Sequence, residues 1–129
     1  MKTKNYSKKR EAILAKIRST TSHPGAEWVH RELKDEIPDL SLGTVYRNIG
    51  LFKEEGHIRS VGTVDGQERF DGNTLPHGHF ICTACSAVLD FFGFEEHPEV
   101  AACLDQTGCQ VNRIELTAYG LCTACKEAQ

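Results

Sequence analysis

The chain has 129 residues, enough for one ordinary domain or two small ones with modest cores. The formal net charge is -3, but residues 1–69 carry 13 Lys and Arg against 10 Asp and Glu, whereas residues 70–129 carry 2 against 8. The first part is therefore net basic, and we expect it to meet a polyanion. The sequence contains no apolar run of membrane-spanning length and no apolar segment behind its basic N-terminus. These features exclude a membrane protein, and we expect a cytoplasmic one.

The first 34 residues predict two helices separated by a break. Ser7 is expected to cap a helix over residues 8–18, which has apolar residues at helical spacing and a basic opposite face. His23-Pro24-Gly25 interrupts the pattern. Apolar residues recur over 26–34, so a second helix is predicted there.

A third helix is the best defined of the set. Ser41 is a natural N-cap, Gly56 is a natural C-terminal stop, and Val45, Ile49 and Phe52 form one apolar stripe. The other face is polar, aromatic and basic, which would suit a DNA major groove. An ordinary amphipathic surface helix is the alternative for this helix taken alone. The outward residues that we expect to meet DNA are Ser41, Thr44, Tyr46 and Arg47.

The segment after the third helix predicts a β-hairpin. Two short strand-like runs, 58–61 and 67–70, flank the turn pair Asp65-Gly66. Three short helices followed by a hairpin are typical of a winged helix-turn-helix domain, and this context favours DNA binding for the third helix. Arg59 and Arg69 on the hairpin are expected to contact phosphates.

The composition changes after Phe70. Residues 71–76 are rich in turn formers and are expected to be a hinge. The predicted protein is thus α+β, with a winged-helix DNA-binding domain at 1–70 and a second, small α/β domain at 77–129. The elements predicted in the second domain are strands at 79–81, 87–92 and 111–118 and a helix at 95–107 that ends at Gly108.

Four of the six cysteines form two matching pairs. Each pair has the C-x2-C spacing, and 36 residues separate them. In a secreted protein an even cysteine count would favour disulfides, but cytoplasmic thiols stay reduced, so zinc is favoured here. Four thiolates make a closed tetrahedral site that is structural, and this ion would tie the two ends of the second domain together. The predicted ligands of this structural Zn²⁺ are Cys82, Cys85, Cys122 and Cys125.

A second metal centre is predicted beside the first cysteine pair. His77 and His79 are two residues apart, so on a strand both rings point to the same side. Asp71 and Asp90 are the nearest acidic candidates. Imidazoles with carboxylates suit Fe²⁺ or Mn²⁺. Each residue taken alone is more often a solvated side chain or a cap, so the pattern as a whole carries the hypothesis.

The accumulated motifs resemble the ferric uptake regulator (Fur) family of bacterial metal-dependent repressors, and the resemblance covers nearly the whole chain. Within the family, the sequence is most similar to the peroxide-sensing branch. The motifs that carry the resemblance are His23-Pro24-x-Ala26, Leu42-Gly-Thr44-Val45-Tyr46-Arg-Asn48, Arg69-Phe70-Asp71, His77-x-His79-x2-Cys82-x2-Cys85 and Tyr119-Gly120-x-Cys122-x2-Cys125.

The resemblance implies a complete regulatory ligand set, including one histidine that the spacing alone does not place. Iron-sensing members typically carry Glu where this chain has Asp90, and zinc-sensing members usually include a Cys ligand that is not found at these positions. Other members have an extra N-terminal helix, of which this chain is expected to hold only part. The implied Fe²⁺ or Mn²⁺ ligands are His23, Asp71, His77, His79 and Asp90.

The resemblance also implies a mechanism. An ion that takes His23 from the first domain and His77, His79 and Asp90 from the second would fix the hinge, and a homodimer formed through the second domain would bind a palindromic DNA operator. In the peroxide branch, bound Fe²⁺ reacts with hydrogen peroxide and a ligand histidine gains oxygen, which here implies His23 or His77. We therefore expect a transcriptional repressor and no enzyme.

Two other functions remain open from the sequence. An iron- or manganese-responsive uptake regulator would have the same architecture without the redox step. A small metallohydrolase could use the His/Asp centre, but the sequence shows no His-Glu-x-x-His element, and a basic winged helix would then have no role.

Overall fold

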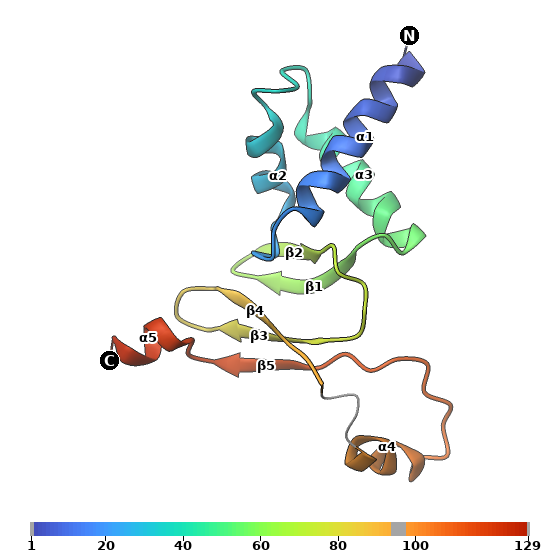
Figure 1. Ribbon diagram of the computed structural model, residues 1–129, viewed down its shortest axis with the longest axis vertical. Helices are drawn as coiled ribbons and strands as arrows, with labels where there is room; N and C mark the ends of the chain where they lie inside the picture. Colours follow the sequence, from blue (N-terminus) through green and yellow to red (C-terminus); the bar gives the residue numbers. More distant parts are fainter. Residues whose placement is uncertain (1, 94–97, 129) are drawn as a thin grey trace. The chain divides into compact units, whose positions relative to one another are not determined.

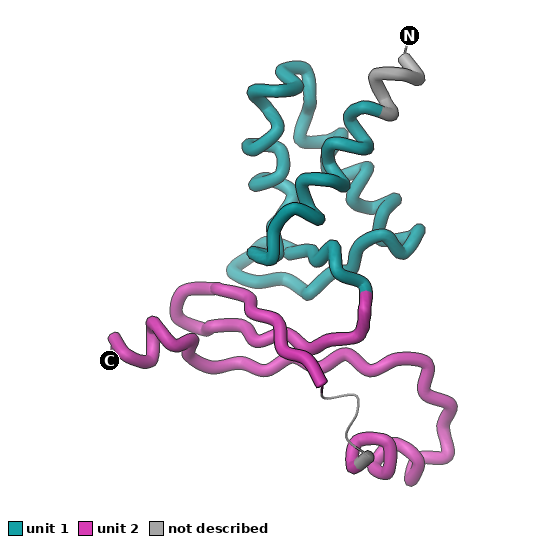
Figure 2. The backbone as a smooth tube through the Cα atoms, viewed as in Figure 1, with its two compact units in different colours: residues 1–74 teal, residues 75–129 magenta. Residues whose placement is uncertain are grey.

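The computed structural model describes residues 2–93 and 98–128 of the chain. Its backbone forms two compact units, Met1–Thr74 and Leu75–Gln129, here called the N-terminal and C-terminal units (Figure 2). The boundary between them falls inside the turn-rich segment 71–76. Among the described helices, none has the length and apolar character needed to cross a bilayer.

The N-terminal unit is a winged helix. Three helices are followed by an antiparallel hairpin, which lies at one end of the helices (Figure 1). This is the architecture that the sequence predicts for the first domain. The elements are α1 (Lys2–Arg18), α2 (Ala26–Leu33), α3 (Leu42–Glu55), β1 (Arg59–Val64) and β2 (Gln67–Asp71).

One apolar core holds this unit together. The stripe predicted for α3 is buried, and Phe52 is fully enclosed. Ile58 and Phe70 join the same cluster from the hairpin, so the wing is anchored to the helices by its own apolar side chains. Burial of such side chains contributes roughly 1.5–3 kcal/mol each, which makes this cluster the main source of the unit's stability.

Local sequence signals define α3 and the hairpin turn. Ser41 caps the helix by accepting the Thr44 N–H at 3.1 Å, and Gly56 ends it in the left-handed conformation with φ 80°. Asp65 and Gly66 both have positive φ, 53° and 81°, as a type I′ hairpin turn requires. These three predictions are confirmed.

The first helix begins earlier than the sequence analysis predicts. It starts at Lys2, so Ser7 lies within α1 and does not cap it. Residues 2–18 contain neither Gly nor Pro, and the lysines in this stretch are good helix formers. The presence of Ser7, a residue type that can cap a helix, therefore does not make the helix begin there.

The C-terminal unit contains a small mixed sheet in the order β4-β3-β5 (Figure 1). The central strand pairs antiparallel with β4 and parallel with β5. The elements are β3 (Gly78–Cys82), β4 (Val88–Phe91), α4 (Pro98–Asp105), β5 (Thr117–Gly120) and α5 (Thr123–Glu127).

Two predicted elements of this unit are corrected. The strand predicted at 111–118 is wrong over most of its length, because β5 begins only at Thr117, where pairing with β3 begins. Leu116 still accepts the backbone N–H of His79 at 3.0 Å, but the described ladder between β3 and β5 includes no residue before Thr117, and a strand without a ladder is not stable. Helix α4 is shorter than the predicted 95–107, of which residues 95–97 lie outside the described residues, and α5 was not predicted.

Replacement of the Ser41 cap should destabilise the N-terminal unit. Ser41→Ala leaves the Thr44 N–H without its acceptor, at a cost of about 1 kcal/mol in the free energy of unfolding. Ser41→Asp retains an acceptor and is the matched control. The only tryptophan, Trp28, lies in this unit, so urea unfolding followed by its fluorescence reports on the unit directly. Equal unfolding free energies for the wild type and Ser41→Ala would contradict the assignment.

Candidate metal centres and DNA-binding face

The four paired cysteines gather at one end of the C-terminal sheet. Cys82 ends β3, Cys85 follows in the next turn, and Cys122 and Cys125 lie at the start of α5. Their sulfur atoms all lie within 4.8 Å of one another, and Cys85 Sγ is 3.8 Å from Cys122 Sγ. Two half-sites separated in sequence are thus one group in space.

The thiols of this group differ in acidity. The backbone N–H of Cys122 donates to Cys82 Sγ over 3.4 Å, and this hydrogen bond contributes most to lowering the pKa of Cys82 to about 6. In contrast, the side chains of Cys122, Cys82 and Cys85 raise the pKa of Cys125 to about 12. One thiolate therefore forms readily, while the last thiol resists ionisation among its neighbours.

This arrangement fits zinc. A divalent cation supplies the positive charge that lets four crowded thiols ionise together, and four sulfur ligands leave no open position. The N–H bond from Cys122 is the kind of outer contact that orients a ligand sulfur. The group therefore suits a structural ion, as the C-x2-C spacing predicts.

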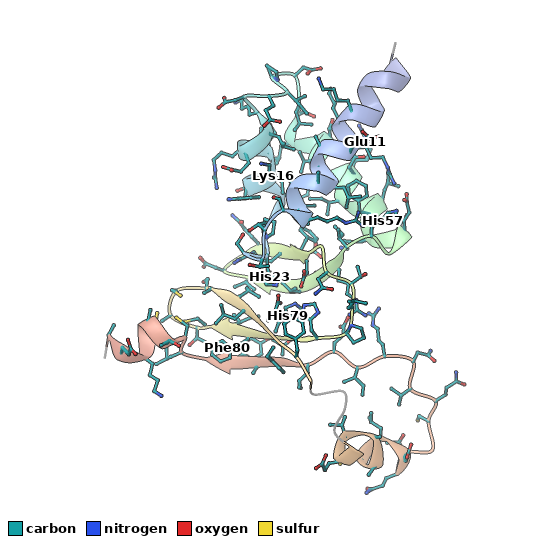
Figure 3. The ribbon with its side chains drawn as sticks, in the orientation of Figure 1. Glu11, Lys16, His23, His57, His79 and Phe80 are labelled. Carbon is teal, nitrogen blue, oxygen red and sulfur yellow. The ribbon has the colours of Figure 1, made fainter. Side chains whose placement is uncertain are left out.

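Three of the predicted regulatory ligands form a cluster within the C-terminal unit. Asp90 Oδ1 lies 3.1 Å from His77 Nε2 and 3.4 Å from His79 Nε2. His79 is the direct cross-strand partner of Asp90, whereas Phe80 leaves β3 on the opposite side (Figure 3). The pairing of β3 with β4 thus brings this carboxylate to both imidazoles.

The hydrogen bonding of His77 indicates which nitrogen is available for a metal. Its Nδ1 lies 2.7 Å from the Leu75 carbonyl oxygen, which can only accept, so Nδ1 carries the proton. In the neutral ring Nε2 then presents a lone pair toward the Asp90 carboxylate. Two electron-pair donors this close need a proton or a cation between them. A divalent ion satisfies both, so the cluster fits a metal with nitrogen and oxygen ligands.

Aromatic side chains pack against His77 and against its neighbour Gly78. Gly78 faces Phe91 directly across the sheet, and a Cβ at Gly78 would meet the Phe91 ring closer than real Cβ atoms approach. The missing side chain therefore makes room for that ring, on the face of the sheet opposite to His79 and Asp90. Phe92 stacks on the His77 ring with centroids 5.2 Å apart. The stacking contact restricts the rotation of the His77 ring.

The other two predicted regulatory ligands pair within the N-terminal unit. His23 Nε2 lies 3.2 Å from Asp71 Oδ2, and both side chains are buried. The second carboxylate oxygen of Asp71 accepts the backbone N–H of Asn73 at 2.8 Å, which fixes the orientation of the carboxylate. This pair offers one nitrogen and one oxygen to a cation.

The backbone at His23 is strained. Its φ is 57°, in the left-handed region that costs a residue with a Cβ roughly 1–2 kcal/mol. The Arg69 guanidinium donates to the His23 carbonyl oxygen, and also to the Ser22 carbonyl oxygen at 2.7 Å. Partial burial lowers the pKa of Arg69, although an arginine remains charged. Contacts from β2 thus hold the turn before α2.

The outer face of α3 carries the predicted DNA-binding residues. Tyr46 is 53% exposed and Arg47 is also exposed, whereas Thr44 is half-buried. Ser41 uses its hydroxyl to cap the helix. Arg59 is half-buried on β1, and its contact with phosphate stays a prediction, as does that of Arg69.

Sequence reasoning missed the supporting residues. It treated Arg69 only as a phosphate contact and gave Gly78, Phe91 and Phe92 no role. One signal was available for Arg69: residues 69 and 71 alternate on a strand, so the side chain must lie on the same face as the predicted ligand Asp71. No signal in the sequence places the Phe91 ring over Gly78, because that contact depends on the register of β3 with β4.

A winged helix joined to a four-thiol group and to two His/Asp groups defines the protein as a metal-responsive DNA-binding regulator. A sequence model of the Ferric uptake regulator family matches residues 2–119, and the chain belongs to this family. The chain is 34% identical over 122 residues to the peroxide operon regulator of Bacillus subtilis, with 93% of this chain and 83% of the relative covered.

Solved structures agree with this assignment. The peroxide stress regulator of Campylobacter jejuni superposes with a TM-score of 0.78 at 26% identity, covering 94% of this chain and 91% of that protein. The ferric uptake regulator of Helicobacter pylori, described as having three functional metal-binding sites, superposes with a TM-score of 0.83. That match covers 92% of this chain and 80% of the other at 18% identity, so it supports the fold alone.

Loss of one zinc ligand should release the metal. Cys85→Ser removes a thiolate from the closed set, and we expect zinc to fall from one ion per chain to near zero and the melting temperature to drop. Cys103→Ser is the matched control, since Cys103 is exposed and outside the four-sulfur group. Elemental analysis and thermal unfolding measure both effects. A folded Cys85→Ser protein that retains its zinc would refute the assignment.

A side chain at position 78 should disturb the sheet that carries the histidines. Gly78→Ala forces the Phe91 ring to move, at a cost of about 1–3 kcal/mol in the free energy of unfolding. Phe91→Ala removes the obstacle, so the added alanine should cost less in that background than in the wild type. The four proteins of this double-mutant cycle are compared by chemical denaturation. Equal costs of Gly78→Ala in both backgrounds would show that the ring is not the cause.

Proposed function

We propose that the protein is a metal-dependent transcriptional repressor that releases DNA when hydrogen peroxide oxidises a histidine ligand of its regulatory metal. The cluster of His77, His79 and Asp90 carries this proposal, because its ligands are nitrogen and oxygen only and suit Fe²⁺ or Mn²⁺. The similarity to peroxide regulators of other bacteria supports the same signal.

The proposed regulatory site draws on both units. The N-terminal unit contributes the pair of His23 and Asp71, and the C-terminal unit contributes the cluster around Asp90. An ion that needs ligands from both units is bound only when the units adopt a compatible orientation. Metal binding therefore favours one orientation, and a preference of a few kcal/mol is enough to control DNA occupancy.

We propose that the DNA-binding form is a homodimer joined through the C-terminal units. Strand β5 is at the edge of the three-stranded sheet, and Tyr119 on it is 68% exposed. Leu116 and Val111 add exposed apolar surface in the preceding segment. Two copies related by a twofold axis would present two α3 helices to a palindromic operator, with the basic side chains on α3 and the wing available for phosphates.

The chemistry of sensing needs one oxidant, hydrogen peroxide. Fe²⁺ supplies the electron transfer that cleaves the O–O bond when it is bound. In the net reaction one peroxide oxygen replaces the hydrogen of an imidazole C–H bond, the ring loses two electrons, and the other oxygen leaves as water. His23 and His77 are the proposed targets, because both are buried and their rings are held in fixed orientations. An oxidised ring is a weaker ligand, so metal and DNA are released.

Peroxide treatment of the iron-loaded protein should add one oxygen to a ligand histidine. Protein loaded anaerobically with Fe²⁺ is exposed to peroxide, digested and analysed by mass spectrometry, while DNA binding is followed by filter binding. We expect a gain of one oxygen on the peptide of His23 or His77 and loss of DNA binding. The Mn²⁺-loaded protein should bind DNA without either change.

Internal controls separate specific from general oxidation. The peptide that contains His57, which lies outside the ligand set, should gain no oxygen. If the ligand histidines stay unmodified while Fe²⁺ and Mn²⁺ both support DNA binding, the protein is instead an iron- or manganese-responsive regulator. Asp90→Glu tests the ligand set further, since retained metal-dependent DNA binding without the peroxide response would support sensing through Asp90.

A further inference from the structure

The turn at residues 22–25 is attached to strand β2 by a run of contacts within the N-terminal unit. The Arg69 guanidinium donates through Nε to the His23 carbonyl oxygen and through Nη2 to the Ser22 carbonyl oxygen at 2.7 Å. The backbone N–H of Phe70 donates to the Pro24 carbonyl oxygen at 2.9 Å. Three successive carbonyl groups of the turn are therefore bonded to two successive residues of the strand.

The strand that makes these contacts is itself firmly held. Phe70 is 2% exposed and belongs to the main apolar cluster, so β2 has a fixed position against the helices. Arg69 and Asp71 are two residues apart on this strand and lie on the same face. One of them holds the backbone of His23, and the other meets its imidazole Nε2 at 3.2 Å.

Without these contacts, the backbone of His23 is expected to leave its present conformation. His23 has a φ of 57°, a conformation that residues with a Cβ rarely adopt. The proline that follows disfavours the right-handed helical region for His23, so the relaxed alternative is an extended backbone. A change from left-handed to extended backbone redirects the Cα–Cβ bond, and with it the imidazole. The direction of the His23 ring thus depends on contacts made to its own carbonyl oxygen.

We propose that Arg69 is a positioning residue for the His23 imidazole. By donating hydrogen bonds to the carbonyl oxygens of Ser22 and His23, it holds the imidazole in the direction required for metal binding. This inference rests on the proposed function, in which His23 is a ligand of the regulatory metal. The planar guanidinium is suited to the task, because its N–H groups form a rigid fork that spans two acceptors. The close packing of the turn continues at Gly25, where a Cβ would lie 3.1 Å from Gln67 Oε1.

The proposal differs from a phosphate contact in what it predicts for Arg69→Lys. Lysine keeps the positive charge but cannot present a planar fork, so a phosphate contact would largely survive while the grip on two carbonyl groups would not. Mn²⁺ affinity is measured without DNA, by calorimetry on protein that carries its zinc. We expect Arg69→Lys to weaken Mn²⁺ binding about 10- to 100-fold, the range typical for loss of an outer-shell contact at a metal site.

Arg31→Lys is the matched control, since Arg31 is exposed on α2 and no metal or DNA role is assigned to it. It should leave Mn²⁺ affinity unchanged. Zinc content and circular dichroism verify that each variant is folded. Should Arg69→Lys fail to fold, Arg69→Gln takes its place, because the glutamine amide can still donate to one of the two carbonyl groups.

A double-mutant cycle with His23→Ala shows whether Arg69 acts through His23. In the His23→Ala background, Arg69→Lys should cause no further loss of Mn²⁺ affinity. Co²⁺ replacing Mn²⁺ gives a second readout, because its visible spectrum should change in Arg69→Lys as it does in His23→Ala. A purely structural role would weaken binding equally in both backgrounds and leave the spectrum unchanged, and this result would overturn the inference.

The same measurements distinguish a positioning role of Arg69 from the role of His23 as a ligand. If His23→Ala weakens Mn²⁺ binding but Arg69→Lys does not, the positioning role is wrong and the proposed ligand set stands. If His23→Ala itself leaves Mn²⁺ affinity unchanged, His23 is not a ligand, and both the ligand set and the role of Arg69 are overturned.

Discussion

The structure brings electron-pair donors into close groups, and each group needs a proton or a cation to offset their mutual repulsion. Four thiols within one group cannot all ionise without a compensating charge, and the pKa of Cys125 is raised by its neighbours for this reason. The His77 Nε2 and the Asp90 Oδ1 lie 3.1 Å apart under a similar constraint, because a lone pair on that nitrogen would face the carboxylate. In both cases the backbone brings the donors together, so a bound metal ion would relieve the repulsion between them.

The two units differ in what stabilises their folds. The N-terminal unit has an apolar cluster that includes Phe52, Ile58 and Phe70, which is sufficient for a small helical domain. Among the described residues of the C-terminal unit, the buried apolar side chains are Ile81, Cys82 and Val88. Such a core is small for a chain of this length, and small domains of this kind need a metal or a partner. Zinc and a second copy are therefore expected to contribute to folding of the C-terminal unit as well as to function.

The features that could be predicted from the sequence are those that depend on local rules. Ser41 and Gly56 set the ends of α3, Asp65-Gly66 sets the hairpin turn, and the cysteine spacing indicates the four-sulfur group, because each depends on residues that are neighbours in the chain or on a fixed ligand chemistry. Strand β5 was misplaced because a strand begins where a partner is available, and that partner is distant in sequence. His23 was placed in the ligand set only through the family resemblance, because no spacing rule links it to the other ligands. The second role of Arg69 depends on the folded position of the turn.

The two cysteine pairs are synthesised at different times, and this order affects when the four-sulfur group can form on the nascent chain. Cys82 and Cys85 leave the ribosome before Cys122 and Cys125, with 36 residues between the pairs, whereas every residue of the winged-helix core precedes them. Domains fold from the N-terminal side during synthesis. The N-terminal unit is thus fully synthesised while the first pair of thiols still lacks the second pair. The four-sulfur group can therefore form only after the end of the chain has been made, when the N-terminal unit is already able to fold.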